Sequence, residues 1–383
     1  MQLARLFKNT FILGFGHVLA RIIAFLLVII HTKNFEPHDF GKYTLVFVLI
    51  AFGTCLFSHG IDSALLKFYG QSNNEKNKQT YFSTALWWHL FFSFFLGLVF
   101  AIIIFCGGLQ YFSQNKLVLY SVVGIMIFDT LILDYKVLLR LNRQNWFFVF
   151  IELLNASLIV VLNFIYIQIY GMSYEYIFYI NLLISLLVFI ILFFKHINFL
   201  LVMPNWEYLK KLLLFAWPLL FSSIANITNE LADRFMIDRL SENATYDVGI
   251  YSANYKLGIF MLLAVTGFKF AWQPYFINQT NRFNDGDSEL FAQVGTYYLM
   301  IASYILIIFS FNIELAAPYI MQREEYLVGL KIVPVVLIAY LIHGLGQLQI
   351  PGIYFKNKSS VLPWIHGSTA LVNVSLNYFL IKH

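Results

Sequence analysis

Long apolar runs alternate with short polar breaks along the whole chain. Each run is about 20 residues long, the length that an α-helix needs to cross about 30 Å of hydrocarbon. The runs predict eleven transmembrane helices, near residues 10–30, 44–66, 81–104, 117–138, 146–168, 176–194, 212–232, 249–271, 294–316, 332–352 and 362–380. The pattern therefore predicts an all-α polytopic membrane protein.

Composition supports this class and excludes others. Hydrophobic residues make up 60% of the chain and charged residues 12%, whereas charged residues are about 25% of an average soluble domain. The net charge of +5 is spread over many loops rather than gathered in one patch, which argues against nucleic acid as a partner. The two cysteines, Cys55 and Cys106, lie in or beside apolar runs and indicate neither a disulfide framework nor a zinc site.

The distribution of basic residues predicts the orientation in the membrane. With the N-terminus inside, the larger share of the 25 Lys and Arg residues falls on the cytoplasmic side, as the positive-inside rule requires. Arg21 and Lys256 are the exceptions, because they lie inside predicted spans. We therefore expect a cytoplasmic N-terminus.

Two segments 208 residues apart share a faint pattern. Leu6-Phe7 stands 34 residues before Gly41, and Leu214-Phe215 stands the same distance before Gly249. Six spans separate the two segments, so both halves would have the same orientation, as in a parallel repeat about an axis along the membrane normal. Chance is the alternative, because these residue types are common in the chain.

The repeat predicts two lobes. Residues 1–200 would form an N-terminal lobe with six spans, and residues 201–383 would form a C-terminal lobe with five. The polar segment from Lys195 to Lys211 would link them. The tenth span, with His343, Gly344 and Pro351 among its residues, is expected to be broken or bent, as helices at transport sites often are.

Several stretches carry a resemblance to a known family. They are LFKNTFILGFGHVLARIIAFLLVIIHTKNFEPHDFGKYTLVFVLIAF with the following GIDSALLKFYG, then ADRFMID, VGIYSANYKLG and FKFAWQPYF, and near the end LVNVSLNYFLI. Together they resemble Wzx-type polysaccharide biosynthesis flippases of the multidrug/oligosaccharidyl-lipid/polysaccharide exporter superfamily. Such proteins usually have about twelve to fourteen spans in two six-helix lobes, so the resemblance implies that this chain is truncated at its C-terminal end.

The resemblance implies a transport function rather than an enzymatic one. The expected cargo is an undecaprenyl-diphosphate-linked oligosaccharide, moved across a bacterial inner membrane by alternating access for O-antigen, capsule or exopolysaccharide assembly. The expected partners are this substrate, membrane lipid and other glycan-assembly proteins. No cofactor is expected beyond a coupling ion, proton or sodium.

A diphosphate needs cations, and two are placed inside apolar spans. Arg21 lies midway along the first span, where a charge costs about 2.5–3.5 kcal/mol on insertion scales. It also falls where the related lipid II flippases carry an arginine. Lys256 lies inside the eighth span and could act likewise. The alternative for Arg21 is an intramembrane ion pair, for example with Asp62 or Glu230.

Acidic and amide residues suggest further contacts. Asp62, Glu230 and Asp233 are candidates for ion coupling, although Glu230 and Arg234 are four residues apart and could satisfy each other. Asn226 lies on the same helical face as Glu230 and Asp233. Polar residues that share a face of the fifth span could hydrogen-bond sugar hydroxyls, or could instead bond to neighbouring helices. They are Glu152, Asn155 and Asn163.

Two other classes of function remain as alternatives. A multidrug exporter of the same superfamily would share the architecture but would bind an amphipathic cation, and Arg21 favours an anionic substrate instead. A membrane-embedded glycosyltransferase, ligase or polymerase would need a catalytic carboxylate or histidine on a sizeable outer loop. Glu36, His38 and Asp39 lie in a loop that is too short for this, and no catalytic motif of the hydrolase, metalloprotease or phosphate-loop type is present.

Overall fold

The computed structural model describes residues 2–103, 115–279, 285–355 and 361–382, and every regular element in these ranges is helical. The described chain forms two compact units. Unit 1 comprises residues Met1–Lys42 and Asn243–Leu362, and unit 2 comprises Tyr43–Glu242 and Pro363–His383. These units do not follow the predicted division at residue 200, which is based on the sequence repeat and stays a prediction.

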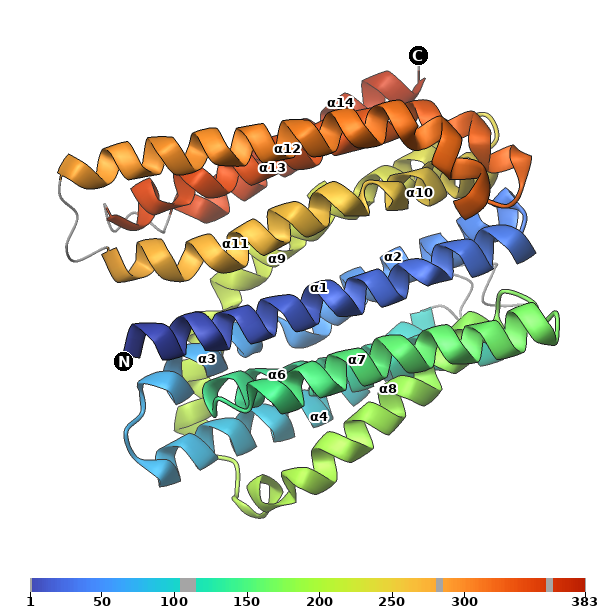
Figure 1. The fold of residues 1–383 in the computed structure, drawn as a ribbon. Coiled ribbons are helices and arrows are strands. Elements are labelled where there is room, and N and C mark those ends of the chain that lie inside the picture. The colour runs from blue at the N-terminus through green and yellow to red at the C-terminus, as the bar shows by residue number, and fades with distance from the viewer. Residues whose placement is uncertain (1, 104–114, 280–284, 356–360, 383) are drawn as a thin grey trace. The chain divides into compact units, whose positions relative to one another are not determined.

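The first helix, α1, is central to unit 1. It packs along α11, although the two helices are far apart in the chain (Figure 1). An edge-on contact between Phe25 and Phe260, with ring centroids 5.4 Å apart, and stacking of Phe260 on Phe309 join three of these helices. The elements of unit 1 are α1 (Gln2–Asn34), α10 (Thr245–Leu257), α11 (Ile259–Gln279), α12 (Asp285–Ile320), the short 3-10 helix η4 (Glu324–Lys331) and α13 (Ile332–Phe355).

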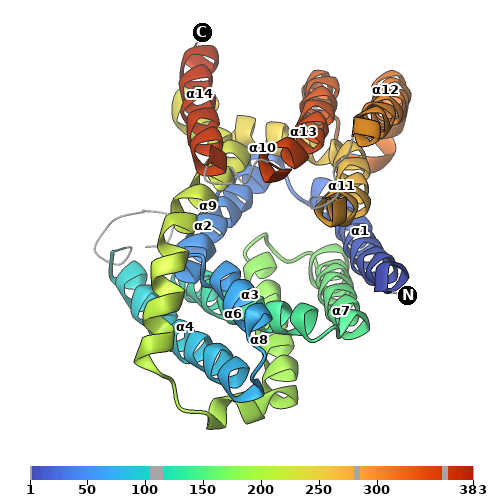
Figure 2. The same cartoon turned by 90° about the vertical axis from the view of Figure 1, so that its left-hand side faces the viewer.

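Unit 2 is centred on α6 (Lys116–Leu141), which is buried along most of its length between α4 (Glu75–Ile103) and α8 (Tyr176–Lys195) (Figure 2). The helix α2 (Pro37–Ser58) begins in unit 1 and continues into unit 2. The remaining elements are α3 (Ile61–Gln71), α7 (Asn145–Asn163), which runs on into the π-helical turn η2 (Phe164–Ile169), η3 (Ile197–Leu201), α9 (Trp206–Leu240) and α14 (Leu362–Lys382).

Ten of the eleven predicted runs correspond to candidate spans. Among the described residues, nine helices are long and apolar enough to cross a membrane, and the pair α10 and α11, bent by 48°, makes a tenth if it counts as one span. The eleventh run forms α14, which has 21 residues but is not among these apolar helices. The number of spans and the cytoplasmic N-terminus therefore stay predictions.

Two helix breaks differ from the sequence prediction. The run 44–66 is not one helix, because α2 ends at Ser58 and α3 begins at Ile61. His59 and Gly60 between them have φ angles of +32° and +82°, and the left-handed region suits glycine. A Cβ on Gly60 would also lie 2.9 Å from the carbonyl oxygen of Ala216 on α9. The chain therefore turns where α9 passes close to its backbone.

The second difference concerns the tenth span. The predicted break there is wrong, because α13 is a single helix from Ile332 to Phe355. Gly344 instead makes room for the Tyr298 side chain, whose hydroxyl donates to the carbonyl of Leu341 over 3.0 Å. The broken span is the eighth, at Gly258, where a Cβ would collide with Val336 of α13.

Reciprocal glycine contacts join the start of α2 to α10 within unit 1. A Cβ on Gly41 would collide with the carbonyl oxygen of Thr245, and a Cβ on Gly249 would collide with the carbonyl oxygen of Pro37. Pro37 and Thr245 are 208 residues apart, as are Gly41 and Gly249. Such mutual contacts are what a two-fold axis produces. The weak sequence repeat therefore coincides with a symmetric helix crossing.

Candidate functional site

Arg21 lies midway along α1 and is half-buried. Its Nε donates to Nε2 of His17, one turn earlier on the same helix, over 3.1 Å. The His17 ring is edge-on to Phe270 of α11, at 6.1 Å between centroids. The His17 nitrogen must carry a lone pair to accept this bond, so the imidazole is neutral and the guanidinium is the charged partner. His17 thereby orients the charged guanidinium of Arg21.

Lys256 lies in the last turn of α10, directly before the break at Gly258. Its Nζ is 4.8 Å from the ring centroid of Phe40, the geometry of a cation–π contact. Phe40 also packs edge-on against Tyr326, whose hydroxyl donates to the carbonyl of Phe35 over 2.9 Å. Lys256 therefore belongs to a cluster at the turn between α1 and α2.

The structure shows a separate partner for each of the two predicted cations. Arg21 is bonded to His17 on α1, and Lys256 lies over the ring of Phe40 at the start of α2. Joint binding of one diphosphate by Arg21 and Lys256 stays a prediction.

The polar face predicted on the fifth span is partly used inside unit 2. Glu152 on α7 forms an ion pair with Lys136 on α6, with 2.6 Å between Oε1 and Nζ. The amide of the buried Asn163 donates to the carbonyl of Ile159 on its own helix over 2.7 Å. Asn155 is half-buried. For Glu152 and Asn163 the structure thus shows bonds to protein groups, and a role of these residues in sugar binding stays a prediction.

The Lys136–Glu152 pair should contribute modestly to stability. Both side chains are partly exposed, so we expect an interaction energy of about 1 kcal/mol or less. A double-mutant cycle with Lys136→Ala and Glu152→Ala, read by thermal unfolding in detergent, measures it. An interaction energy well above about 1 kcal/mol would contradict this expectation.

The acidic face of α9 shows a different partner for Arg234 from the one considered in the sequence analysis. Arg234 pairs with Asp233, with 2.6 Å between NH1 and Oδ1, and its NH1 also donates to the backbone carbonyl of Glu230. The ion pair that the structure shows for Arg234 is thus with Asp233, and its contact with Glu230 is to the backbone. The Glu230 and Asn226 side chains are exposed. Asp233 is half-buried, and its charge is offset by Arg234.

Asp62 lies in the first turn of α3 and is half-buried. Its Oδ2 accepts from the Ser63 hydroxyl over 3.5 Å. Burial raises the pKa of the Asp62 carboxyl above its ordinary value. A carboxyl of this kind can change protonation closer to neutral pH, which is compatible with the predicted role in ion coupling.

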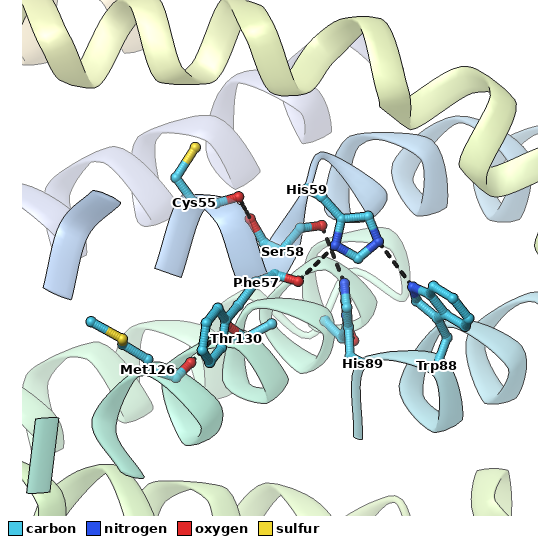
Figure 3. Close-up of polar contacts among 9 residues, drawn as sticks. Cys55, Phe57, Ser58, His59, Trp88, His89, Met126 and Thr130 are labelled. Carbon is cyan, nitrogen blue, oxygen red and sulfur yellow. Dashed lines mark hydrogen bonds and ion pairs between the residues drawn. The ribbon is translucent and has the colours of Figure 1, made fainter. Parts of the chain in front are cut away.

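A buried polar cluster at the α2–α3 break was not predicted from the sequence (Figure 3). The break leaves the carbonyls of Phe57 and Ser58 without the amide partners of a continuous helix. Nδ1 of His59 lies 2.7 Å from the Phe57 oxygen, and Nε2 of His89 on α4 lies 3.2 Å from the Ser58 oxygen. Two histidines therefore cap the two carbonyls.

The second nitrogen of each histidine is also bonded. Nε1 of Trp88 donates to Nε2 of His59 over 2.9 Å. Nδ1 of His89 lies 2.6 Å from Oδ2 of Asp134 on α6, and both of these side chains are fully buried. The two imidazole rings are edge-on, at 5.4 Å between centroids. The cluster thus joins the α2–α3 break to α4 and α6.

An apolar pocket opens beside this cluster within unit 2. It has a volume of about 780 Å³ and is lined by side chains from the end of α2, from α4 and from α9. His59 and Trp88 are polar members of its wall, and Trp217 and Pro218 form part of the α9 side. The remaining wall is leucine, valine, isoleucine and phenylalanine, so the pocket could accept a hydrocarbon chain but offers little to a sugar.

One sequence signal could have revealed the cluster. Ser58, His59 and Gly60 interrupt the run 44–66 with three residues that do not suit a lipid-facing helix. His89 and Asp134 stand alone in apolar runs, and an intramembrane ionisable group indicates a functional site by default. Their pairing could not be read from the sequence, because 45 residues separate them.

Comparison with protein families identifies the chain. Residues 6–279 match the sequence profile of a family described as "Polysaccharide biosynthesis protein". The chain belongs to this family. The family prediction from the sequence is thereby confirmed. None of the curated proteins matches the chain by sequence.

Solved structures of other proteins show the same fold as this chain. The lipid II flippase MurJ in an inward closed conformation superposes with a TM-score of 0.73 at 14% identity, covering 97% of this chain and 84% of the other. An inward-facing multidrug resistance MATE family transporter of the MOP superfamily gives 0.64 at 12%, covering 95% and 94%. The Vibrio cholerae MATE transporter VcmN in its bent form gives 0.64 at 13%, covering 95% and 86%. The predicted all-α transporter fold is confirmed, and these neighbours are transporters and flippases rather than enzymes.

Proposed function

We propose that this protein is a flippase for an undecaprenyl-diphosphate-linked oligosaccharide. It would move the glycan from the cytoplasmic to the outer leaflet of a bacterial inner membrane, for assembly of O-antigen, capsule or exopolysaccharide. Family membership supports the substrate class. The observation that carries the proposal is Arg21, a cation held midway along an apolar helix by His17.

The placement of Arg21 fits an anionic cargo. A charge at this depth is retained against a cost of about 2.5–3.5 kcal/mol, so its function must outweigh that cost. A guanidinium donates in a fixed fork that matches phosphate oxygens. Lys256 lies in the last turn of α10, over the ring of Phe40. In this proposal both cations contact the diphosphate during its passage.

Alternating access would require the two predicted lobes, residues 1–200 and 201–383, to move about a contact between them. The reciprocal crossing of Gly41 with Thr245 and of Gly249 with Pro37 fits such a contact, because backbones that touch without intervening side chains can rotate about one another. Proton or sodium coupling through Asp62, Glu230 or Asp233 is part of the proposal. Asn226 and Asn155 are proposed to meet the sugar.

Complementation tests the function. The chain is expressed in strains that lack their own flippase for O-antigen, capsule or exopolysaccharide, and surface glycan is measured together with membrane insertion. Restored glycan in any strain supports the proposal. Membrane-inserted protein that restores none, but lowers the accumulation of cationic dyes such as ethidium, would contradict it. That outcome would favour a multidrug exporter, whose fold is shared.

A further inference from the structure

His89 and Asp134 meet at the α2–α3 break in an arrangement that constrains their protons. Both ring nitrogens of His89 face oxygen acceptors, the Asp134 carboxylate at 2.6 Å and the Ser58 carbonyl at 3.2 Å. A hydrogen is needed in each contact. The pair therefore holds two hydrogens, as imidazolium with carboxylate or as neutral imidazole with carboxylic acid. Both forms have no net charge.

Removal of one proton has a defined structural consequence. The remaining hydrogen stays between Nδ1 and the carboxylate, where the contact is shorter and charge-assisted. The Nε2 lone pair then faces the lone pairs of the Ser58 carbonyl, and that hydrogen bond is lost. A buried net negative charge also remains. The free carbonyl and the charge would both be relieved by a rearrangement of the break.

We propose that His89 and Asp134 together bind one coupling proton, and that its release frees the Ser58 carbonyl and lets the α2–α3 break change conformation. The proton-binding part is independent of the cargo, while the coupling role rests on the flippase function proposed above. The ligand is a proton, and no other reactant is required. Asp62, Glu230 and Asp233, the carboxylates expected from the sequence, are not members of this pair.

A second observation supports a site rather than a passive core pair. Among the described residues, Oδ1 of Asp134 is buried and has no hydrogen-bond partner. Most buried side-chain polar atoms in proteins have a hydrogen-bond partner. This oxygen is a free acceptor beside the His89 contact, so the carboxyl has a second atom that can hold a hydrogen.

His59 provides a contact from the pair to the apolar pocket. Its ring lies edge-on to His89 and forms part of the pocket wall. Nε2 of His59 accepts from Trp88 while Nδ1 lies against the Phe57 carbonyl, which defines a neutral ring with its hydrogen on Nδ1. The side chain between the pair and the pocket is thus a neutral imidazole.

The helices packed around His89 and Asp134 contribute the following ionisable groups. Asp62 on α3 lies near both members, and Arg140 on α6 acts on Asp62. Tyr135 follows Asp134 on α6 and packs against His196 beside η3. The side that α9 presents to the pocket consists of Leu213, Leu214, Trp217, Pro218 and Leu220, none of which titrates. Asp62 is therefore the charge that could most strongly shift proton binding by the pair.

The test begins with proton binding in the absence of cargo. Infrared difference spectra of the full-length protein in detergent are recorded between about pH 5 and pH 9, the range in which a histidine–carboxylate pair can titrate. We expect carboxyl and imidazole bands that disappear in both Asp134→Asn and His89→Gln. Asp129→Asn is the matched control, since Asp129 lies on the same helix and accepts from Ser185 over 2.7 Å. Its spectrum should keep the bands assigned to Asp134.

Two outcomes of the infrared experiment would overturn the proposal. One is a wild-type protein without any carboxyl or imidazole change over this range. The other is an Asp134→Asn spectrum identical to that of the wild type. His89→Gln keeps the test decisive if Asp134→Asn fails to fold, because glutamine can still donate to the Ser58 carbonyl.

Transport then tests the coupling. In proteoliposomes, a proton gradient should stimulate wild-type glycan transport at least tenfold, while Asp134→Asn should exchange glycan without responding to the gradient. A gradient response that persists in Asp134→Asn would refute the coupling role. If even the wild type moves no glycan while the Asp134 bands are present, the flippase proposal fails and proton binding by the pair stands.

Discussion

Gly249→Ala is expected to destabilise the protein by about 3 kcal/mol, the upper part of the range for overpacking in a well-packed core. The added Cβ would overlap the Pro37 carbonyl oxygen, and its nearest contacts are all backbone atoms. A backbone cannot move aside as a flexible side chain can. Thermal unfolding in detergent should show a midpoint lower by about 5 °C.

Because the crossing of α2 and α10 is symmetric, the same prediction applies to Gly41. Gly41→Ala should cost about as much, because its Cβ would overlap the Thr245 carbonyl oxygen in the same way. Export should fall with both variants. A much smaller effect of either one would show that the crossing is not symmetric in the folded protein.

The chain offers matched controls for the glycine variants. Gly267 on α11 and Gly346 on α13 have no atom within 4 Å of an added Cβ. Gly267→Ala and Gly346→Ala should leave stability unchanged or raise it by about 0.5–1 kcal/mol, as alanine does in an exposed helix. Equal losses in all four variants would refute the close-approach explanation.

Arg21→Ala is expected to reduce glycan export by about tenfold to a hundredfold. A hydrogen bond that involves a charged group contributes about 1.5–3 kcal/mol, and each 1.4 kcal/mol is a factor of ten in binding. Arg21→Lys should retain part of the export, because the charge remains while the forked geometry is lost. Surface glycan in the complemented strain, normalised to inserted protein, is the measurement.

Two further variants separate substrate binding from structure. His17→Gln should cause a smaller loss than Arg21→Ala, since His17 only orients the guanidinium. Arg323→Ala is the matched arginine control: Arg323 lies 3.7 Å from Glu36 and donates to the carbonyl of Lys33 at one end of unit 1, and export should be retained. Full export by Arg21→Ala would remove the main support for an anionic cargo.

The sequence alone determined the class of the protein and most of its helices. A bilayer offers no hydrogen-bond partners to the backbone, so an apolar run of about 20 residues has to be helical wherever it lies in the fold. Helix ends within such runs were less certain. Gly60 ended one helix, because its φ is +82° and the α9 backbone lies close to it, whereas Gly344 stayed within a helix that makes room for neighbouring side chains.

Only the tertiary structure decided which polar groups meet. Arg234 forms an ion pair with Asp233, and Glu152 forms one with Lys136 on another helix. His89 met Asp134 because α4 and α6 pack side by side, and it met Ser58 because the break in α2 freed a carbonyl. Helical periodicity places a side chain on a face of its own helix. The neighbour that the face meets is fixed by packing between segments far apart in the chain, so the proton-binding pair could be recognised only in the folded protein.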